Sequence, residues 1–384
     1  MLRPNLTNLC NPNAPERDFD RIVRKTGGTL FTNCFTPSPD TPRSLGCFWS
    51  GQTPWRNGCD SKLKYPRYFL KTPSFLDLLH ERDYELNFFS PPLHLDLGIL
   101  PDGYVEKGRH NQDMDLKKYL SETTFSDNSF TFISLPDFHW ALDDLINTMR
   151  GVEQGLYVLA DCLEIIVSAP VFECFDYVLI FSDHGCKIDS QFRTEEKYQL
   201  MNRDRTNIFM YLREKGQAEL IYNDKLCSIV DIYPTICDIL KIPYVADCGY
   251  SLRSPHSHDY IIAEDSGTFT AEVRENMSLW AVIRQNGFYF RDLERRYFYE
   301  NESTFDLPPE HLDELIAENS TIFHKYLKAE RVLSLYKNMN NYAGPYSNGD
   351  ARVLPFAYRA YQKKKQKYLY LLSRVLKRLI RGRK

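Results

Sequence analysis

Two short segments of the sequence carry residue types that could perform ester chemistry together. The first is Ser38-Pro-Asp-Thr-Pro-Arg-Ser44, where a threonine and an arginine follow a proline-rich stretch. A hydroxyl at a helix start lies beside unpaired backbone N–H groups that attract anions. Thr41 could therefore attack phosphorus or sulfur while Arg43 neutralises the non-bridging oxygens. The alternative is that Thr-Pro simply starts a helix, which is the commoner role of such a pair.

The second segment is Phe181-Ser-Asp-His-Gly185, which directly follows the most apolar run of the chain. In open α/β sheets, ligand-binding groups sit in loops beyond the carboxyl ends of the strands. Adjacent carboxylate and imidazole groups suit a divalent cation such as Mn, Zn, Mg or Ca. Asp183 and His184 are therefore predicted metal ligands, with a structural turn as the alternative.

Hydrophobic periodicity predicts the elements that position these loops. The runs Phe130–Leu135, Tyr177–Phe181 and Ile208–Leu212 resemble buried strands of a parallel sheet. A helical stretch at 152–167 separates the first two, as in a βαβ unit. Near the first segment, Thr41 suits a helix N-cap and Gly51 its C-terminal stop. Other segments predict helices at 15–25 and 72–81, one helix or a pair of short helices at 224–240, and strands at 29–35, 84–89 and 260–263.

A change of pattern follows residue 270. Apolar residues at 279–283 and 288–293 flank Arg284-Gln-Asn-Gly287, which is a good hairpin signal, and 297–299 could add a third strand. We therefore expect an antiparallel element appended to the main sheet. The predicted organisation is a catalytic α/β domain at 1–270, a small antiparallel subdomain at 271–345 and a basic tail at 346–384.

Composition and charge narrow the class of protein. The chain has 384 residues, 43% of them hydrophobic, which is typical of a globular protein. The ten cysteines include no Cys-x-x-Cys pair, which favours reduced thiols in a cytoplasmic protein. Residues 358–384 contain 11 Lys or Arg and no acidic residue, whereas residues 1–357 contain 37 basic and 51 acidic residues. An acidic body with a basic tail does not resemble a nucleic-acid-binding protein.

The basic tail needs its own interpretation. Apolar residues recur at helical spacing between its Lys and Arg residues, a pattern typical of an amphipathic helix on an anionic membrane surface. Residues 358–384 could thus give peripheral contact with the inner membrane. The alternative is a helix that packs its apolar face on the domain. We see no run of about 18 apolar residues, so we expect no spanning helix.

Several motifs, taken in order, resemble the alkaline phosphatase and sulfatase superfamily. The stretch Ser182-Asp-His-Gly resembles the metal-binding motif of sulfatases, phosphonate monoester hydrolases and phosphoglycerol transferases. Residues 28–35, followed by Asp40-Thr-Pro-Arg-Ser and Phe48-Trp-Ser-Gly51, resemble the nucleophile region. The later segments Val230-Asp-Ile-Tyr-Pro-Thr235 and Gly249-Tyr-Ser-Leu252 also match. Together they cover about residues 15–265.

The resemblance implies a fold and a set of site residues. The fold would be α/β and alkaline phosphatase-like: a mostly parallel central sheet flanked by helices, with a small antiparallel C-terminal sheet. Thr41 would be the nucleophile and would also contact the divalent metal ion held by Asp183 and His184. The resemblance also suggests His139 as a substrate-contacting histidine, although helix capping or packing is an equal alternative. Asp137 is a weaker candidate for a metal ligand. The predicted anion contacts are Lys187 and Arg205. For each of them the alternative is a solvated surface charge.

Two departures from the family pattern shape the prediction. No Cys-x-Pro-x-Arg sequence is present for a formylglycine, so a threonine nucleophile moves the expected substrate from sulfate towards phosphate esters. Family members also open with an apolar strand that ends in an acidic metal ligand, and no such strand precedes Pro15. We expect residues 1–5 to be the loop that follows this strand, and the acidic ligand to be missing from the given sequence.

The sequence therefore predicts a metal-dependent phosphodiester transferase or hydrolase. Its substrate would be a phosphoester, with a bacterial surface polysaccharide or its lipid-linked precursor as the suggested target and no nucleic acid as partner. A sulfatase-like hydrolase of sulfuric esters is one alternative. The other is a catalytically silent relative that binds glycan or protein.

Overall fold

A computed structural model describes residues 1–300, except for residues 12, 58, 60–71, 91–107, 112–114, 145–147, 187, 189–202, 245–248, 265–279, 286 and 292–296. All of these described residues belong to one compact unit, residues 1–333. The predicted basic tail lies outside them, so its amphipathic helix stays a prediction. Within the described part of the chain, no helix combines the length and the apolarity needed to cross a bilayer.

The central sheet is mixed and has four strands in the order β6-β7-β1-β8. Its members are β1 (Gly28–Phe31), β6 (Tyr177–Phe181), β7 (Met210–Glu214) and β8 (Leu220–Asn223). A parallel sheet in the order β4-β3-β5 contains β3 (Glu85–Phe89), β4 (Arg109–Asn111) and β5 (Ser129–Ile133). A short parallel ladder joins β2 (Cys34–Phe35) to β9 (Cys227–Ser228). The predicted α/β class is confirmed.

The direction of β7 differs from the prediction. We expected the apolar run that contains it to be a parallel strand, yet it pairs antiparallel with both β1 and β6. The strand is buried on both faces: Met210 and Leu212 point to one side and Tyr211 to the other. A strand covered on both sides is an unbroken apolar run whichever way it points, so composition does not reveal its direction.

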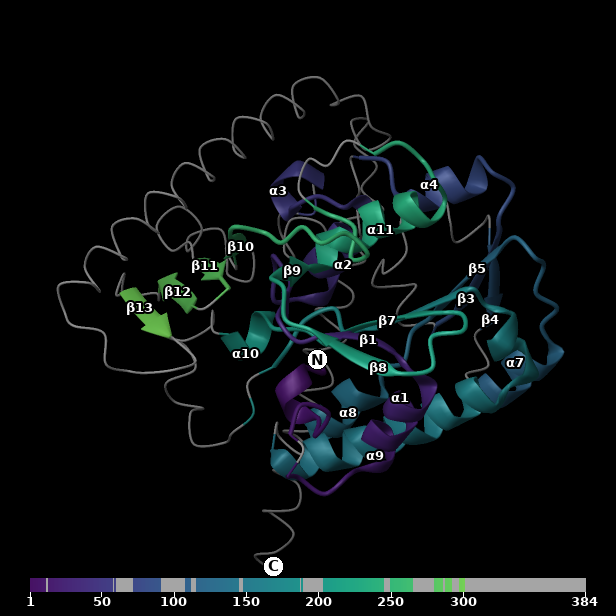
Figure 1. Ribbon diagram of the computed structural model, residues 1–384, viewed down its shortest axis with the longest axis horizontal. Coiled ribbons are helices and arrows are strands. Elements are labelled where there is room, and N and C mark those ends of the chain that lie inside the picture. Colours follow the sequence, from purple (N-terminus) through teal and green to yellow (C-terminus); the bar gives the residue numbers. More distant parts are fainter. Residues whose placement is uncertain are drawn as a thin grey trace, which may run out of the picture. The chain divides into compact units, whose positions relative to one another are not determined.

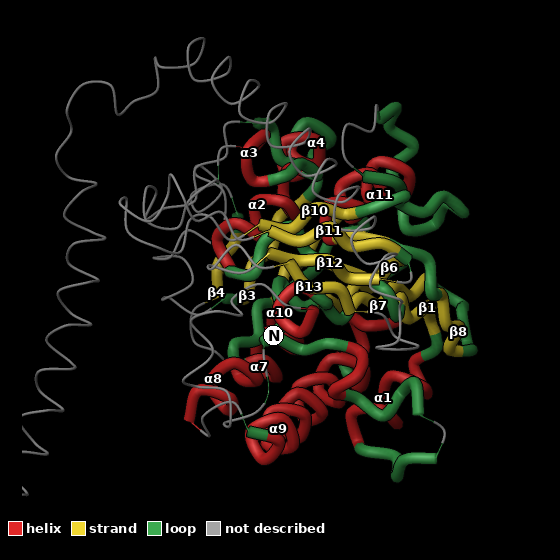
Figure 2. The backbone as a smooth tube through the Cα atoms, turned by 90° about the vertical axis from the view of Figure 1, so that its left-hand side faces the viewer, coloured by secondary structure: helices red, strands yellow, loops and turns green. Residues whose placement is uncertain are grey.

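Helices cover both faces of the central sheet. Figure 1 shows one group below β1, β7 and β8 and another above them, and Figure 2 shows the same layers from the side. The lower group contains α1 (Asp18–Thr26), α8 (Asp137–Asp144) and α9 (Met149–Ser168). The upper group contains α2 (Thr41–Ser50), α3 (Pro54–Asn57), α4 (Phe75–His80) and α11 (Ile232–Ile239). The shorter elements are η1 (Pro4–Leu6), α7 (Leu116–Glu122), η2 (Pro170–Cys174), α10 (Arg203–Thr206) and η4 (Ile229–Asp231).

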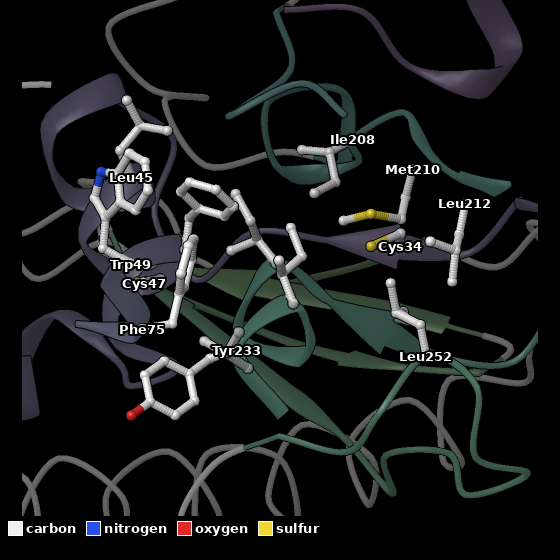
Figure 3. Close-up of a cluster of buried hydrophobic side chains, with 14 of the residues drawn as sticks. Cys34, Leu45, Cys47, Trp49, Phe75, Ile208, Met210, Leu212, Tyr233 and Leu252 are labelled. Atoms are coloured by element: carbon white, nitrogen blue, oxygen red, sulfur yellow. The ribbon is translucent and has the colours of Figure 1, made fainter. Parts of the chain in front are cut away.

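The hydrophobic cluster in the upper layer holds α2 in place. Figure 3 shows Leu45, Cys47 and Trp49 of this helix in the same cluster as Phe75 of α4 and Met210 of β7. Cys47 and Trp49 are fully buried. Burying large apolar side chains is the main stabilising contribution to a fold, and close packing leaves such a helix little freedom to shift. The first turn of α2, which carries Thr41, is therefore fixed to the core.

The predicted small antiparallel sheet is confirmed, and it has four strands in the order β10-β11-β12-β13. They are β10 (Ile261–Glu264), β11 (Trp280–Arg284), β12 (Gly287–Arg291) and β13 (Tyr297–Glu300). β10 lies within residues 1–270, which we assigned to the catalytic domain. The domain boundaries themselves stay predictions.

Candidate active site

Helix α2 presents Thr41 in its first turn. Asp40 is the N-cap, and its carboxylate accepts a hydrogen bond from the backbone N–H of Arg43 at 3.3 Å. The prediction that Thr41 caps the helix is wrong by one residue, because the aspartate carboxylate already supplies the capping acceptor. The helix ends as predicted, at Gly51 in the left-handed conformation with φ 63°.

The loop after β6 is anchored by backbone bonds to β7 and to the N-terminal segment. The N–H of Ser182 donates to the carbonyl of Phe209 at 3.0 Å, and the Ser182 hydroxyl donates to the carbonyl of Leu2. Phe209 in turn donates to the Leu2 carbonyl at 3.0 Å. These bonds fix the backbone from which the next two side chains, those of Asp183 and His184, project.

Three predicted site residues meet at this point. Oγ1 of Thr41 lies 3.3 Å from Nε2 of His184, and the Thr41 hydroxyl also hydrogen-bonds the Asp183 carboxylate. Nδ1 of His184 lies 2.7 Å from the carbonyl oxygen of Gly185, which can only accept. We therefore assign the Nδ1–H tautomer, which leaves the lone pair of Nε2 facing Thr41.

The electrostatics of the pair favour a charged carboxylate and a neutral imidazole. Burial alone would raise the pKa of Asp183, but the attraction of His184 and the hydrogen bonds from the Thr41 hydroxyl and the His184 N–H favour the charged carboxylate, and that pKa lies below its usual range. Burial lowers the pKa of His184, against the attraction of Asp183. The site thus offers one negative charge and one uncharged nitrogen ligand near neutral pH.

Helix α10 is hydrogen-bonded both to the loop before α2 and to the loop after β6. The backbone carbonyl of Arg205 accepts from the N–H of Gly185 at 2.9 Å, and the Arg205 side chain donates to the carbonyl of Pro39 at 3.1 Å. A Cβ at Gly185 would lie 1.9 Å from the carbonyl oxygen of Asp204. Sequence reasoning missed this role of α10, because backbone groups carry most of it and they leave no motif.

The remaining predicted residues are placed as follows. The guanidinium of Arg43 is only 1% exposed and is ion-paired with Asp40, so contact with a substrate anion would require this pair to open. His139 lies in the first turn of α8, next to Phe138, which packs against α9. Asp137 begins the same helix, and Lys187 lies outside the described residues. The roles proposed for these residues stay predictions.

The donor set around Thr41 fits a divalent cation. Lone pairs of the Thr41 hydroxyl, the Asp183 carboxylate and Nε2 of His184 converge, with only the hydroxyl proton among them. A single proton cannot pair with all of these lone pairs. A divalent cation that prefers oxygen and nitrogen ligands would accept the remaining ones. Across the described ranges, no cluster of three or more His, Cys, Asp or Glu side chains is arranged to hold a metal. Asp183 and His184 would be two of the ligands, with Thr41 as a further oxygen.

Comparison with known proteins identifies the fold. No protein-family model matches the sequence, and no curated protein matches it. Among solved structures, the chain is similar to a putative sulfatase from Bacteroides thetaiotaomicron, with a TM-score of 0.63 and 15% identity over 86% of this chain and 90% of that one. It is also similar to a 2-O GAG sulfatase, with a TM-score of 0.60 and 16% identity over the same shares of the two chains.

A third similar structure is the phosphonate monoester hydrolase of Agrobacterium radiobacter. The TM-score is 0.53 and the identity 11%, over 87% of this chain and 94% of that one. At such identities the likeness establishes the fold alone. The chain has the α/β fold of sulfatases and of the alkaline phosphatase superfamily, as the sequence motifs predicted.

Proposed function

We propose that this chain is a metal-dependent enzyme that transfers or hydrolyses phosphoesters, preferentially phosphodiesters, with Thr41 as its nucleophile. The observation that carries the proposal is the 3.3 Å approach of Oγ1 of Thr41 to Nε2 of His184, beside the charged carboxylate of Asp183. The names of the similar structures, sulfatase and phosphonate monoester hydrolase, support chemistry at an ester centre.

In the proposed reaction, the Thr41 hydroxyl loses its proton to solvent and Oγ1 forms a bond to phosphorus as the bond to the leaving oxygen breaks. The leaving oxygen takes up a proton from solvent. Asp183 and His184 would hold the divalent cation, which when bound would favour ionisation of the hydroxyl and neutralise charge on the phosphoryl group. The attachment of Thr41 to a core-packed helix keeps the attacking oxygen in place. Water or an acceptor alcohol then releases the phosphoryl group from threonine.

The nature of the acceptor separates a transferase from a hydrolase. An acceptor alcohol on a glycan or a lipid-linked precursor would make the enzyme a decorator of a bacterial surface polysaccharide, and the basic tail 358–384 would suit work at an anionic membrane. A sulfuric ester could occupy the same site, because sulfate and phosphate have the same tetrahedral shape. A threonine in place of formylglycine favours the phosphoester.

The experiment uses the full chain with Mn, Mg, Zn or Ca and three chromogenic esters: an aryl phosphate diester, an aryl phosphate monoester and an aryl sulfate. We expect the diester to turn over fastest and Thr41→Ala to lower kcat by at least about a thousandfold. Thr26→Ala is the matched control, because the Thr26 hydroxyl donates to the carbonyl of Ile22 in its own helix.

Several results would contradict this proposal. Turnover unaffected by Thr41→Ala would remove the threonine mechanism. Faster turnover of the aryl sulfate than of either phosphate would favour the sulfatase alternative. Absence of both turnover and bound metal would favour the catalytically silent relative.

A further inference from the structure

Ser44 connects helix α2 directly to the backbone of the loop that carries the predicted ligands. It lies one helical turn after Thr41 and is fully buried. Its hydroxyl donates to the backbone carbonyl of Asp183 and lies 2.7 Å from the hydroxyl of Thr36. Helix α2 and the β6 loop are thus joined twice: through the side chains of Thr41 and His184, and through Ser44.

The direction of these hydrogen bonds follows from counting protons. A carbonyl oxygen only accepts, so the single proton of Ser44 goes to Asp183. The Thr36 hydroxyl faces two acceptors, Ser44 at 2.7 Å and the carbonyl of Ser38 at 3.1 Å. We assign its proton to the shorter contact, because the Ser44 proton is already used on Asp183. Thr36 is itself fully buried, and its backbone N–H donates to the carbonyl of Thr206 in α10 at 2.8 Å. The result is an ordered chain from Thr36 through Ser44 to Asp183.

The hydrogen bonds from Thr36 through Ser44 to Asp183 connect elements that are packed in the core. Figure 3 shows Leu45 and Trp49, which follow Ser44 on α2, inside the hydrophobic cluster. Thr36 begins the loop that leads to Thr41, and Asp183 precedes His184. Among the described residues, the hydrogen bonds of the Thr36 and Ser44 hydroxyls go to each other and to backbone groups, and none goes to Oγ1 of Thr41.

We propose that Ser44, oriented by Thr36, is a positioning residue that sets the separation between Thr41 and the Asp183–His184 pair. The structural part of this inference depends only on the hydrogen bonds described, whereas its kinetic consequence rests on the proposed function. A displacement of about 1 Å in the reacting groups can lower a rate by about a hundredfold. Loss of the Ser44 hydroxyl therefore reduces kcat more than it changes KM.

Ser50 provides a matched control on the same helix. It is also buried, and its hydroxyl donates to the carbonyl of Gly46 in its own helix and accepts from the side chain of Asn57. Ser50→Ala therefore removes a buried hydroxyl of the same kind without touching the β6 loop. A difference between Ser44→Ala and Ser50→Ala isolates the link to Asp183.

The first measurement needs no substrate. Hydrogen exchange of the full chain, in buffer containing EDTA, follows the backbone amides of residues 182–186 in wild type, Ser44→Ala and Ser50→Ala. We expect exchange in this segment to rise about tenfold or more in Ser44→Ala and to stay within about twofold in Ser50→Ala. Equal exchange in the two variants overturns the proposal.

The second measurement uses the ester that wild type turns over. We expect Ser44→Ala to lower kcat about ten- to a hundredfold with KM changed less than about threefold, and Ser50→Ala to leave both near wild type. Thr36→Val should lower kcat in the same direction as Ser44→Ala, whereas Thr36→Ser, which keeps the hydroxyl, should restore it. Unchanged kcat in Ser44→Ala overturns the kinetic claim. Absence of turnover in wild type contradicts the proposed function, and the exchange experiment still decides the role of Ser44.

Discussion

Oγ1 of Thr41 lies 3.3 Å from Nε2 of His184, although 143 residues separate them in the sequence. The approach depends on α2, held by its apolar face, and on β6, whose following loop is hydrogen-bonded to Phe209 just before β7. Both atoms carry lone pairs, and Asp183 adds negative charge beside them. A site with this character should attract a divalent cation before it attracts a substrate.

Removal of the Asp183 charge should weaken cation binding. Asp183→Asn keeps the shape of the side chain but loses the negative charge, so the affinity for Mn²⁺ should fall at least about tenfold. Isothermal titration of the full chain measures it directly. Asp238→Asn serves as the control, because Asp238 is an exposed carboxylate that pairs with Arg253. Equal affinities in wild type and Asp183→Asn would show that the cation binds elsewhere.

The lowered pKa of His184 should make the metal-free protein sensitive to mild acid. In the unfolded chain the imidazole takes up a proton near pH 6.5, whereas in the folded protein burial moves its pKa lower. Between these two pKa values the unfolded state binds more protons than the folded state. The contribution of the His184 imidazole to the free energy of unfolding is therefore complete above pH 6.5 and is lost as the pH falls below 6.5. Titration of this one group cannot change the free energy of unfolding by more than about 1.4 kcal/mol per pH unit.

Chemical unfolding in EDTA at a series of pH values from about 7.5 to 5 measures this effect. His184→Gln should show a flatter decline in the free energy of unfolding than wild type. His256→Gln is the comparison, because the side chain of His256 is exposed. A His184→Gln profile parallel to that of wild type would mean that the imidazole does not titrate differently in the folded protein.

The parts of the site that the sequence predicted are those encoded locally. Asp183 and His184 follow an apolar strand, and Gly51 marks a helix end, so each signal lies within a few residues. Residues whose roles depend on distant contacts were not predicted. Ser44 gains its role only because the carbonyl of Asp183 lies next to α2. Arg43 pairs with Asp40, three residues before it, and its predicted contact with a substrate anion stays a prediction.

Gly185 should tolerate no side chain. A Cβ there would lie 1.9 Å from the carbonyl oxygen of Asp204 and 2.7 Å from that of Asn207, both of which belong to the backbone and cannot swing aside. Gly185→Ala should therefore push the β6 loop and α10 apart and destabilise the fold by about 1–3 kcal/mol. Thermal unfolding measures the stability, and Mn²⁺ titration measures the site. A variant with wild-type stability and affinity would contradict the close packing of α10 on this loop.

The buried ion pair between Arg43 and Asp40 should behave as a coupled unit. Arg43 is 1% exposed and pairs with Asp40. Asp40→Ser keeps an N-cap oxygen but removes the negative charge that faces the buried guanidinium. This variant should lower the free energy of unfolding by about 3 kcal/mol. Arg43→Met removes the other charge while keeping an unbranched side chain. In the double variant neither charge remains, so its loss of stability should be smaller than the sum of the two single losses, by at least about 1 kcal/mol. Urea unfolding of the four proteins gives the coupling. Additive losses would contradict the coupling of Arg43 and Asp40.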